Sequence, residues 1–210
     1  FVFEEDHPLG FITTVTYRKT GVIGHLVVSE HARGRRIGPT LVRRAMDYVN
    51  GKGVDSVLLF AVQEGMEVYR KQGFRPYADV MCVQAEKREK PVEREYPGLV
   101  PVAEQDLRSI SDIDSAIFGD DRSRLIEVLY RDYPDLSFKL ERSGRIQGYA
   151  FGRSTSAAND LGPWVCISGS DADARGLFYS VVSRFDNRSV FMGLFSENDQ
   201  AVRIMSELKP

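Results

Sequence analysis

The stretch GHLVVSEHARGRRIGPTLV, residues 24–42, decides the fold. Residues 21–28 are rich in β-branched side chains, which is typical of a strand. Pro39 suits the first turn of a helix, and the apolar residues from Leu41 to Val49 recur at helical spacing. A basic loop lies between these two patterns. The stretch therefore predicts a strand, a loop and a helix in succession.

The loop is a candidate phosphate-binding site, with the sequence Arg33-Gly34-Arg35-Arg36-Ile37-Gly38. A helix N-terminus exposes unpaired N–H groups and the positive end of the helix dipole, and both attract phosphate. Gly34 and Gly38 would let the backbone approach a phosphate without a Cβ clash. The arginines add forked donors, although cations are unfavourable at a helix start. A solvated basic loop is the alternative interpretation.

The sequence on either side of the loop predicts further elements of the same unit. Residues 9–17 are expected to form a hairpin with residues 21–28. The apolar run at 56–62 is typical of a strand covered on both faces. A short helix over 65–72 and more strand over 74–84 follow, and the charged segment after them predicts a linker. We place the N-terminal unit at 1–87, the linker at 88–96 and the C-terminal unit at 97–210.

The second half of the chain repeats the first at a fixed offset. Gly10-Phe11 corresponds to Gly148-Tyr149 (148 − 10 = 138), and Gly38 corresponds to Gly176 (176 − 38 = 138). At the position of the basic loop, however, the second half has Asp171 and Asp173 in place of two arginines. We therefore expect a phosphate site in the first unit and none in the second.

The repeat predicts an α/β (α+β) chain of two units, each a mixed central sheet flanked by helices. The two halves share one plan but are cut at opposite ends. The first begins at the hairpin and the second ends at its last helix. We expect both units to be truncated and the chain, which starts at Phe1, to be a fragment.

Composition excludes several classes of protein. The net charge of −2 argues against a dedicated nucleic-acid binder. The two cysteines, Cys82 and Cys166, lack CxxC spacing, so neither a zinc site nor a disulfide framework is expected, and a structural role is favoured for Cys166. No apolar run is long enough to cross a bilayer. We expect a cytoplasmic protein with no metal and no membrane partner.

Residues 24–42, followed by EVYRKQGF at 67–74, resemble the GNAT superfamily of acyl-CoA-dependent N-acyltransferases. The family hallmark is Arg/Gln-x-x-Gly-x-Gly/Ala, and here Arg33 and Gly38 occupy its first and last positions. Arg36 stands where the family has the middle glycine. A second hallmark, Tyr-x-x-x-Gly-Phe, is met by Tyr69 and Gly73-Phe74. The second half resembles the degenerate C-terminal unit of tandem GNAT proteins.

The resemblance implies an N-acetyltransferase that uses acetyl-CoA as co-substrate and a small-molecule or peptide amine as acceptor. The amine would attack the thioester directly. The strand residues Leu26, Val27 and Val28 would pair with the pantetheine arm, and the loop of residues 33–38 with Thr40 would hold the pyrophosphate. The alternative is a non-catalytic CoA-binding regulatory module. A nucleic-acid-associated protein using the basic stretch 33–44 is less favoured, and a homodimer is left open.

The resemblance also implies roles for single side chains. Tyr69 would be the general acid that protonates the departing thiolate, against the alternative of a packing tyrosine. His25 is a candidate general base on the strand beside the expected thioester, although it could equally be a packed strand residue. Glu30 and Glu64 are further candidates, and a solvated loop carboxylate is the favoured interpretation of each.

Aromatic side chains of the second half are the last candidates. Trp164, Tyr149 and Phe151 could line an acceptor cleft between the units, but core packing of a strand is the favoured interpretation.

Overall fold

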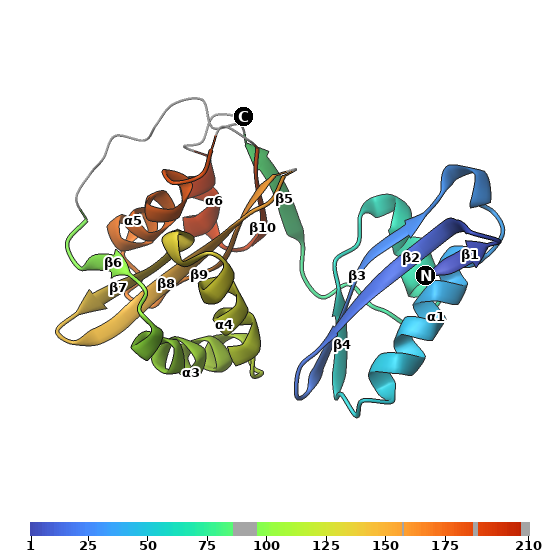
Figure 1. Cartoon of the computed structure of the whole chain (residues 1–210), viewed down its shortest axis with the longest axis horizontal. Helices are drawn as coiled ribbons and strands as arrows, with labels where there is room; N and C mark the ends of the chain where they lie inside the picture. The colour runs from blue at the N-terminus through green and yellow to red at the C-terminus, as the bar shows by residue number, and fades with distance from the viewer. Residues whose placement is uncertain (86–95, 157, 187–188, 207–210) are drawn as a thin grey trace. The chain divides into compact units, whose positions relative to one another are not determined.

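The computed structural model describes residues 1–85, 96–156, 158–186 and 189–206. Its contacts divide the chain into two units, Phe1–Tyr77 and a second that begins at Ala78 (Figure 1). Each unit has its own sheet with helices packed against it. The predicted α/β class with two mixed sheets flanked by helices is therefore confirmed. Most of the predicted linker at 88–96 lies outside the described residues.

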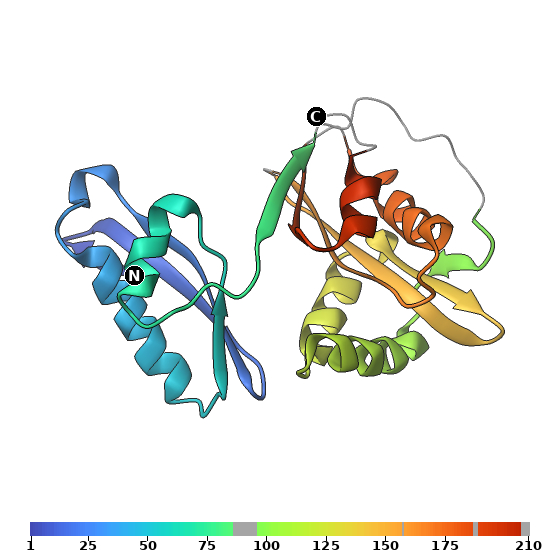
Figure 2. The same ribbon diagram turned by 180° about the vertical axis from the view of Figure 1, so that it is seen from behind.

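The first unit is built on a four-stranded sheet with the order β1-β2-β3-β4. The strands are β1 (Val2–Glu4), β2 (His7–Thr16), β3 (Thr20–Val28) and β4 (Ser56–Leu59). The β2–β3 hairpin is antiparallel, and β4 pairs with β3 in parallel after the crossover through α1 (Ile37–Asn50), as Figure 2 shows. The short elements are η1 (Glu30–Ala32), η2 (Gln63–Gly65) and α2 (Met66–Arg70).

Only one face of the first sheet is covered within the described unit. Leu9 and Leu26 pack against Leu41 of α1. On the opposite face the side chain of Leu58 stays 43% exposed, and Phe60 beyond the end of β4 is 69% exposed. The predicted two-sided cover of residues 56–62 is therefore wrong. Along β4 exposed residues alternate with partly buried ones, so this strand is covered on one face alone within the described unit.

The second unit contains a six-stranded sheet with the order β5-β10-β9-β8-β7-β6. Its strands are β5 (Val80–Ala85), β6 (Leu99–Pro101), β7 (Ser137–Arg142), β8 (Arg145–Ser154), β9 (Asn159–Cys166) and β10 (Val190–Phe195). Its helices are α3 (Leu107–Phe118), α4 (Ser123–Asp132), α5 (Asp171–Val182) and α6 (Asp199–Met205), with short turns η3 (Glu104–Asp106) and η4 (Pro134–Leu136). In Figures 1 and 2 the sheet lies between α5–α6 and α3–α4.

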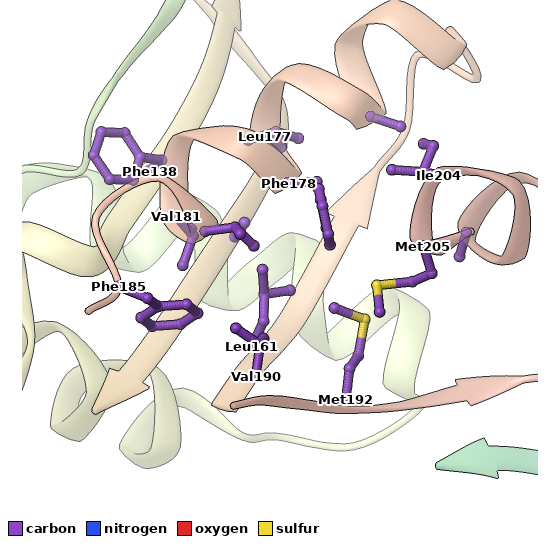
Figure 3. Packing of buried hydrophobic residues seen from close by; sticks show 14 of the residues in the cluster. Phe138, Leu161, Leu177, Phe178, Val181, Phe185, Val190, Met192, Ile204 and Met205 are labelled. Carbon is purple, nitrogen blue, oxygen red and sulfur yellow. The ribbon is translucent and has the colours of Figure 1, made fainter. Parts of the chain in front are cut away.

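Helices cover both faces of the central part of the second sheet, whereas Phe191 and Phe195 on one face of β10 stay exposed. On one face Leu177, Phe178 and Val181 of α5 pack with Ile204 and Met205 of α6, as Figure 3 shows. On the other face α3 and α4 cover a second cluster that includes two fully buried aromatic residues of β8. These two residues are Tyr149 and Phe151, each 0% exposed. The favoured interpretation of core packing is therefore confirmed for both residues, and they do not line an acceptor cleft.

The strand β5 belongs to the second sheet. It pairs antiparallel with β10 over its whole length, from Val80 opposite Phe195 to Ala85 opposite Val190. Our prediction kept this strand in the first unit and placed the boundary at residue 87, whereas the contacts place it between Tyr77 and Ala78. An edge strand pairs with whichever free edge is available, and its own sequence does not state which one.

The predicted repeat appears in the strand pairing itself. Gly10 lies opposite Val28 in the first unit, and Gly148 lies opposite Cys166 in the second, so both members of the pair shift by 138 (148 − 10 and 166 − 28). Thr14 opposite Ile23 and Gly152 opposite Leu161 keep the same offset. Both hairpins also contain a register shift between these two pairs. The halves therefore share a bulged hairpin as well as glycines.

Candidate active site

The start of α1 presents an uncapped helix N-terminus. The N-cap residue is Arg36, which makes no side-chain capping hydrogen bond, and the first turn contains no acidic residue. The hydroxyl of Thr40 donates to the carbonyl oxygen of Arg36 at 3.0 Å, so it braces the loop from inside the helix. The first backbone N–H groups of a helix have no partner within it. The site therefore combines free donors, the positive end of the dipole and exposed arginines, which together suit an anion.

The loop backbone turns twice through the left-handed region. Gly34 has φ +78°, and Arg36 has φ +60° with ψ +17°. Glycine adopts this conformation without cost, whereas an arginine is strained there by about 1 kcal/mol. Arg36 occupies the place of the middle glycine in the hallmark motif. The position where the motif has glycine is therefore left-handed here although an arginine occupies it.

Arg35 is held by an acidic partner that our sequence analysis missed. Its guanidinium donates to both carboxylate oxygens of Glu4, at 2.5 Å and 3.2 Å. This hydrogen bond and the charge of Arg35 lower the pKa of the Glu4 carboxyl, and the same hydrogen bond and the charge of Glu4 raise the pKa of Arg35. Both side chains are about half exposed, so the pair contributes little to stability. Glu4 lies 31 residues away in sequence, which no motif signals.

The residues Leu26, Val27 and Val28 lie on a part of β3 with a partner strand on one side only. The parallel pairing with β4 ends at Ile23 opposite Leu59, while β2 continues beside β3 as far as Val28. The backbone of residues 24–28 is therefore free on its second edge within the described unit. An exposed strand edge can bind an extended chain through main-chain hydrogen bonds.

His25 lies at the bulge where β2 and β3 lose register. Its φ of +49° is left-handed, and its ring is exposed. The imidazole Nδ1 lies 3.1 Å from the hydroxyl oxygen of Thr13 on the neighbouring strand. The bulge turns this side chain out of the normal alternation of the strand, a common role of bulges near functional sites.

Tyr69 lies on α2, which packs against α1. Its ring makes an edge-to-face contact with Phe74 at 6.0 Å between centroids. Burial raises the pKa of the Tyr69 hydroxyl, so this group keeps its proton at neutral pH. Within the described residues no hydrogen bond joins Tyr69 to His25. The hallmark tyrosine and the candidate base therefore belong to the same unit but are not hydrogen-bonded to each other.

The other candidate bases are solvated carboxylates. Glu30 lies in η1 with 89% of its side chain exposed, and only a 3.8 Å ion pair links it to Arg33. Glu64 is exposed in η2. Glu30 and Glu64 are exposed, as His25 is, so the structure does not favour either of them over His25 as the base.

The equivalent helix start in the second unit is closed by its own residues. Ser170 caps α5 by accepting a hydrogen bond from the backbone N–H of Asp173. The carboxylate of Asp173 accepts from Arg142 at 2.5 Å and from Ser168 at 2.9 Å. A Cβ added at Gly176 would lie 2.5 Å from a methyl carbon of Leu99, whereas the nearest atom to one added at Gly38 is 3.9 Å away.

The second unit also contains a small pocket of about 230 Å³ at the end of β9. Trp164 and Cys166 line it together with Ile117 of α3 and Asn198 before α6. Of the three predicted cleft residues, only Trp164 thus borders a cavity. In the first unit a hollow of about 400 Å³ lies beside Glu4, His7 and His31.

Neither a metal site nor a membrane-spanning helix is found among the described residues. Among the described residues no group of three or more His, Cys, Asp or Glu side chains is arranged to hold a metal ion. Within the same part of the chain, no helix has the length and apolar character needed to cross a membrane.

Two family models match the chain: the Acetyltransferase (GNAT) family over residues 1–74 and the Acetyltransferase (GNAT) domain over residues 110–209. Together these matches cover more than half of the chain. The chain belongs to the GNAT acetyltransferase family. The GNAT resemblance predicted from the strand–loop–helix stretch is confirmed, and the match of a second GNAT model agrees with the repeat.

Known proteins similar to this GNAT protein are acetyltransferases by their names. It is 26% identical to the uncharacterized N-acetyltransferase YitH of Bacillus subtilis over 153 residues, 73% of the chain and 53% of YitH. A putative acetyltransferase from Pyrococcus horikoshii is similar with a TM-score of 0.76 and 26% identity, over 98% of this chain and 66% of that one. A GCN5-related N-acetyltransferase from Sphaerobacter thermophilus shares the fold, with a TM-score of 0.68, 16% identity, and coverage of 96% and 74%. The chain spans about half the length of YitH.

Proposed function

We propose that this GNAT protein is an acetyl-CoA-dependent N-acetyltransferase that acts on a primary amine. The observation that carries the proposal is the uncapped start of α1 beside the free edge of β3. Phosphate groups would bind at the loop, where Arg33 and Arg36 add positive charge to the free N–H groups. The pantetheine arm would extend along the free backbone of residues 26–28.

The chemistry follows from what the chain's own groups can do. The amine nitrogen forms a bond to the thioester carbonyl carbon, and the carbon–sulfur bond breaks. His25 takes the proton that the amine must lose, and the hydroxyl of Tyr69 gives a proton to the departing thiolate. The raised pKa of Tyr69 supports its role as a donor, because the group remains protonated until it is used.

The second unit is proposed to lack this activity. Its α5 start has Asp171 and Asp173 in the first turn, and these carboxylates would repel a pyrophosphate. The sequence alone predicts Met205 or Glu207 at the position that corresponds to Tyr69. The parallel strand pairing, in which Val57 corresponds to Val190 (190 − 57 = 133), instead gives Val202 (69 + 133 = 202). Valine has no proton to donate. The second GNAT unit is thus a degenerate copy that serves a structural role.

Calorimetric titration with acetyl-CoA tests the proposal. We expect one site per chain, with a Kd on the order of micromolar. The double variant Arg33→Ala/Arg36→Ala should bind about 100-fold more weakly, because it loses two charge-assisted phosphate contacts of roughly 1.5 kcal/mol each. The control Arg43→Ala/Arg44→Ala removes the same charge from exposed positions later on α1 and should bind normally. Two sites per chain, or equal losses in both double variants, would contradict the assignment.

A non-catalytic CoA-binding module is the second candidate, and one observation favours it: no hydrogen bond among the described residues links the two candidate catalytic side chains. Tyr69→Phe separates the two functions. An enzyme should lose about 100-fold in kcat with acetyl-CoA binding preserved. A binding module should transfer no acetyl group to any amine, even at saturating acetyl-CoA, while the calorimetric site remains.

A further inference from the structure

The two contacts of the Thr13 hydroxyl restrict which nitrogen of the His25 ring can carry a hydrogen. The hydroxyl of Thr13 donates its hydrogen to the carbonyl oxygen of Gly24 at 2.9 Å. A hydroxyl has one hydrogen to donate, and its oxygen can still accept. The imidazole Nδ1 of His25 lies 3.1 Å from the same oxygen. The second contact is therefore a hydrogen bond only when Nδ1 carries the hydrogen and the threonine oxygen accepts it.

This arrangement decides the state of the other ring nitrogen. A neutral imidazole has one N–H, so a hydrogen on Nδ1 leaves a lone pair on Nε2. An exposed histidine without a partner favours the opposite tautomer in water. Thr13 thus opposes the intrinsic preference of the ring, and it does so where the His25 backbone is held at φ +49° by the bulge.

The second unit shows that the bulge does not need this pair. At the corresponding positions it has Phe151 for Thr13 (151 − 13 = 138) and Pro163 for His25 (163 − 25 = 138). The register shift in its hairpin is nevertheless present. The Thr13–His25 contact is therefore an addition of the first unit rather than a requirement of the fold.

We infer that Thr13 is a positioning residue that holds His25 as the Nδ1–H tautomer, so that Nε2 is the atom that accepts the proton from the amine. The inference rests on the proposed acetyltransferase function for the role of Nε2. The tautomer itself does not depend on that function. Thr13 acts through His25 and need not touch the substrate.

Nitrogen-15 NMR of the imidazole rings tests the inference on the full chain. At a pH where the rings are neutral, wild-type His25 should show a protonated Nδ1 and an unprotonated Nε2. Thr13→Val has the same shape and no hydroxyl, and it should move the ring towards the Nε2–H tautomer. Thr13→Ser keeps a hydroxyl and should restore the wild-type pattern. His25→Asn assigns the signals among the three histidines.

Turnover of an amine by the same variants provides the second measurement. Thr13→Val should lower kcat by about tenfold while leaving the KM for acetyl-CoA unchanged, and Thr13→Ser should recover most of the loss. A wild-type His25 protonated on Nε2 would overturn the inference whether or not the chain transfers acetyl groups. A tautomer that switches in Thr13→Val without any change in kcat would overturn the role of Nε2. Failure of the proposed function is separate, because it removes turnover from the wild type and leaves the tautomer readable.

Discussion

The helices α1 and α5 begin at equivalent positions of the repeat, yet their first turns differ in capping and in charge. At the start of α5, Ser170 caps the helix, and Asp171 and Asp173 complement the positive end of the helix dipole. The start of α1 has no cap and is flanked by arginines, which the dipole disfavours. A helix start that its own chain leaves unsatisfied is suited to an external anion. The unit to which we assign acetyl-CoA binding is therefore the one with the less stable helix start.

The two sheets show the same contrast on their other faces. In the second unit α3 and α4 bury the face that carries Tyr149 and Phe151. In the first unit the equivalent face carries Phe11 and Thr13, and its apolar neighbours Val15 and Val27 are about half exposed. The second unit thus has two cores and the first has one. Substitutions at matched positions can test both contrasts.

The largest effect is expected at Asp114, which fixes α3 and α4 on the second sheet. Its side chain is 1% exposed, and it accepts hydrogen bonds from the Tyr149 hydroxyl at 2.6 Å and from the Arg122 guanidinium at 2.6 Å and 2.9 Å. Asp114→Ala removes the buried carboxylate that both Arg122 and Tyr149 bind, so we expect a loss of about 3–5 kcal/mol. Urea unfolding followed by the single tryptophan, Trp164, reports on this unit.

Tyr149→Phe is the control for Asp114, because it removes one hydrogen bond and leaves the ion pair. It should cost about 1–2 kcal/mol. Equal losses in the two variants would mean that the ion pair contributes nothing to holding the helices.

The paired glycines predict the next effect. Gly176→Ala would place a Cβ 2.5 Å from Leu99 and 2.8 Å from the ring of Tyr96, so we expect a loss of about 1–3 kcal/mol from overpacking. Gly38→Ala has room and lies in a helix, so it should be neutral or stabilising by up to about 1 kcal/mol. Thermal melting of both variants checks the opposite signs. A large loss in Gly38→Ala would show that the two helix starts are packed alike.

The Asp173 carboxylate, in the first turn of α5, predicts a dependence of stability on pH. Burial would raise its pKa, but hydrogen bonds from Arg142 and Ser168 outweigh burial and lower it. A lowered folded pKa gives stability that is present above the unfolded value of about 3.9 and is lost as pH falls through the folded pKa. We expect Asp173→Asn to cost about 1–2 kcal/mol at pH 7 and to flatten the decline below pH 4. Trp164 fluorescence in urea at several pH values measures both, and a parallel decline in the variant would contradict the assignment.

Some features could be predicted because they depend on short-range pattern. The strand at 21–28 and the helix after Pro39 follow from side-chain branching and helical spacing, and the structure has β3 and α1 there. The repeat could be found because its glycines sit where backbones approach closely. A Cβ at Gly10 would lie 2.7 Å from the carbonyl oxygen of Val27, and one at Gly148 would lie 2.6 Å from that of Val165.

Other features could not be predicted because they depend on partners distant in sequence. The contact between Thr13 and His25 requires the exact register of a bulged hairpin. The ion pair of Glu4 with Arg35 requires β1 to lie beside the loop. The membership of β5 depends on which sheet edge is free, and its alternating sequence suits either sheet. The roles of Tyr69 and His25 stay predictions, since geometry alone does not measure proton transfer.

The smallest effect is expected at Arg36, the N-cap residue of α1. Its left-handed backbone, φ +60°, strains an arginine and suits glycine. Arg36→Gly should therefore stabilise the first unit by up to about 1 kcal/mol, read as slower amide hydrogen exchange in α1. Gly34→Ala, at φ +78°, is the matched opposite and should destabilise it by a similar amount.

The same Arg36→Gly variant distinguishes the contribution of the loop backbone to the proposed acetyl-CoA binding from the contribution of the Arg36 charge. It keeps the backbone N–H groups in place and removes one guanidinium, so acetyl-CoA should bind about tenfold more weakly while the unit becomes more stable. Weaker binding together with greater stability is the expected sign of a residue retained for a ligand. If binding is unchanged, the helix start alone holds the phosphates and Arg36 serves solubility. If stability falls, the loop does not depend on a left-handed residue at this position.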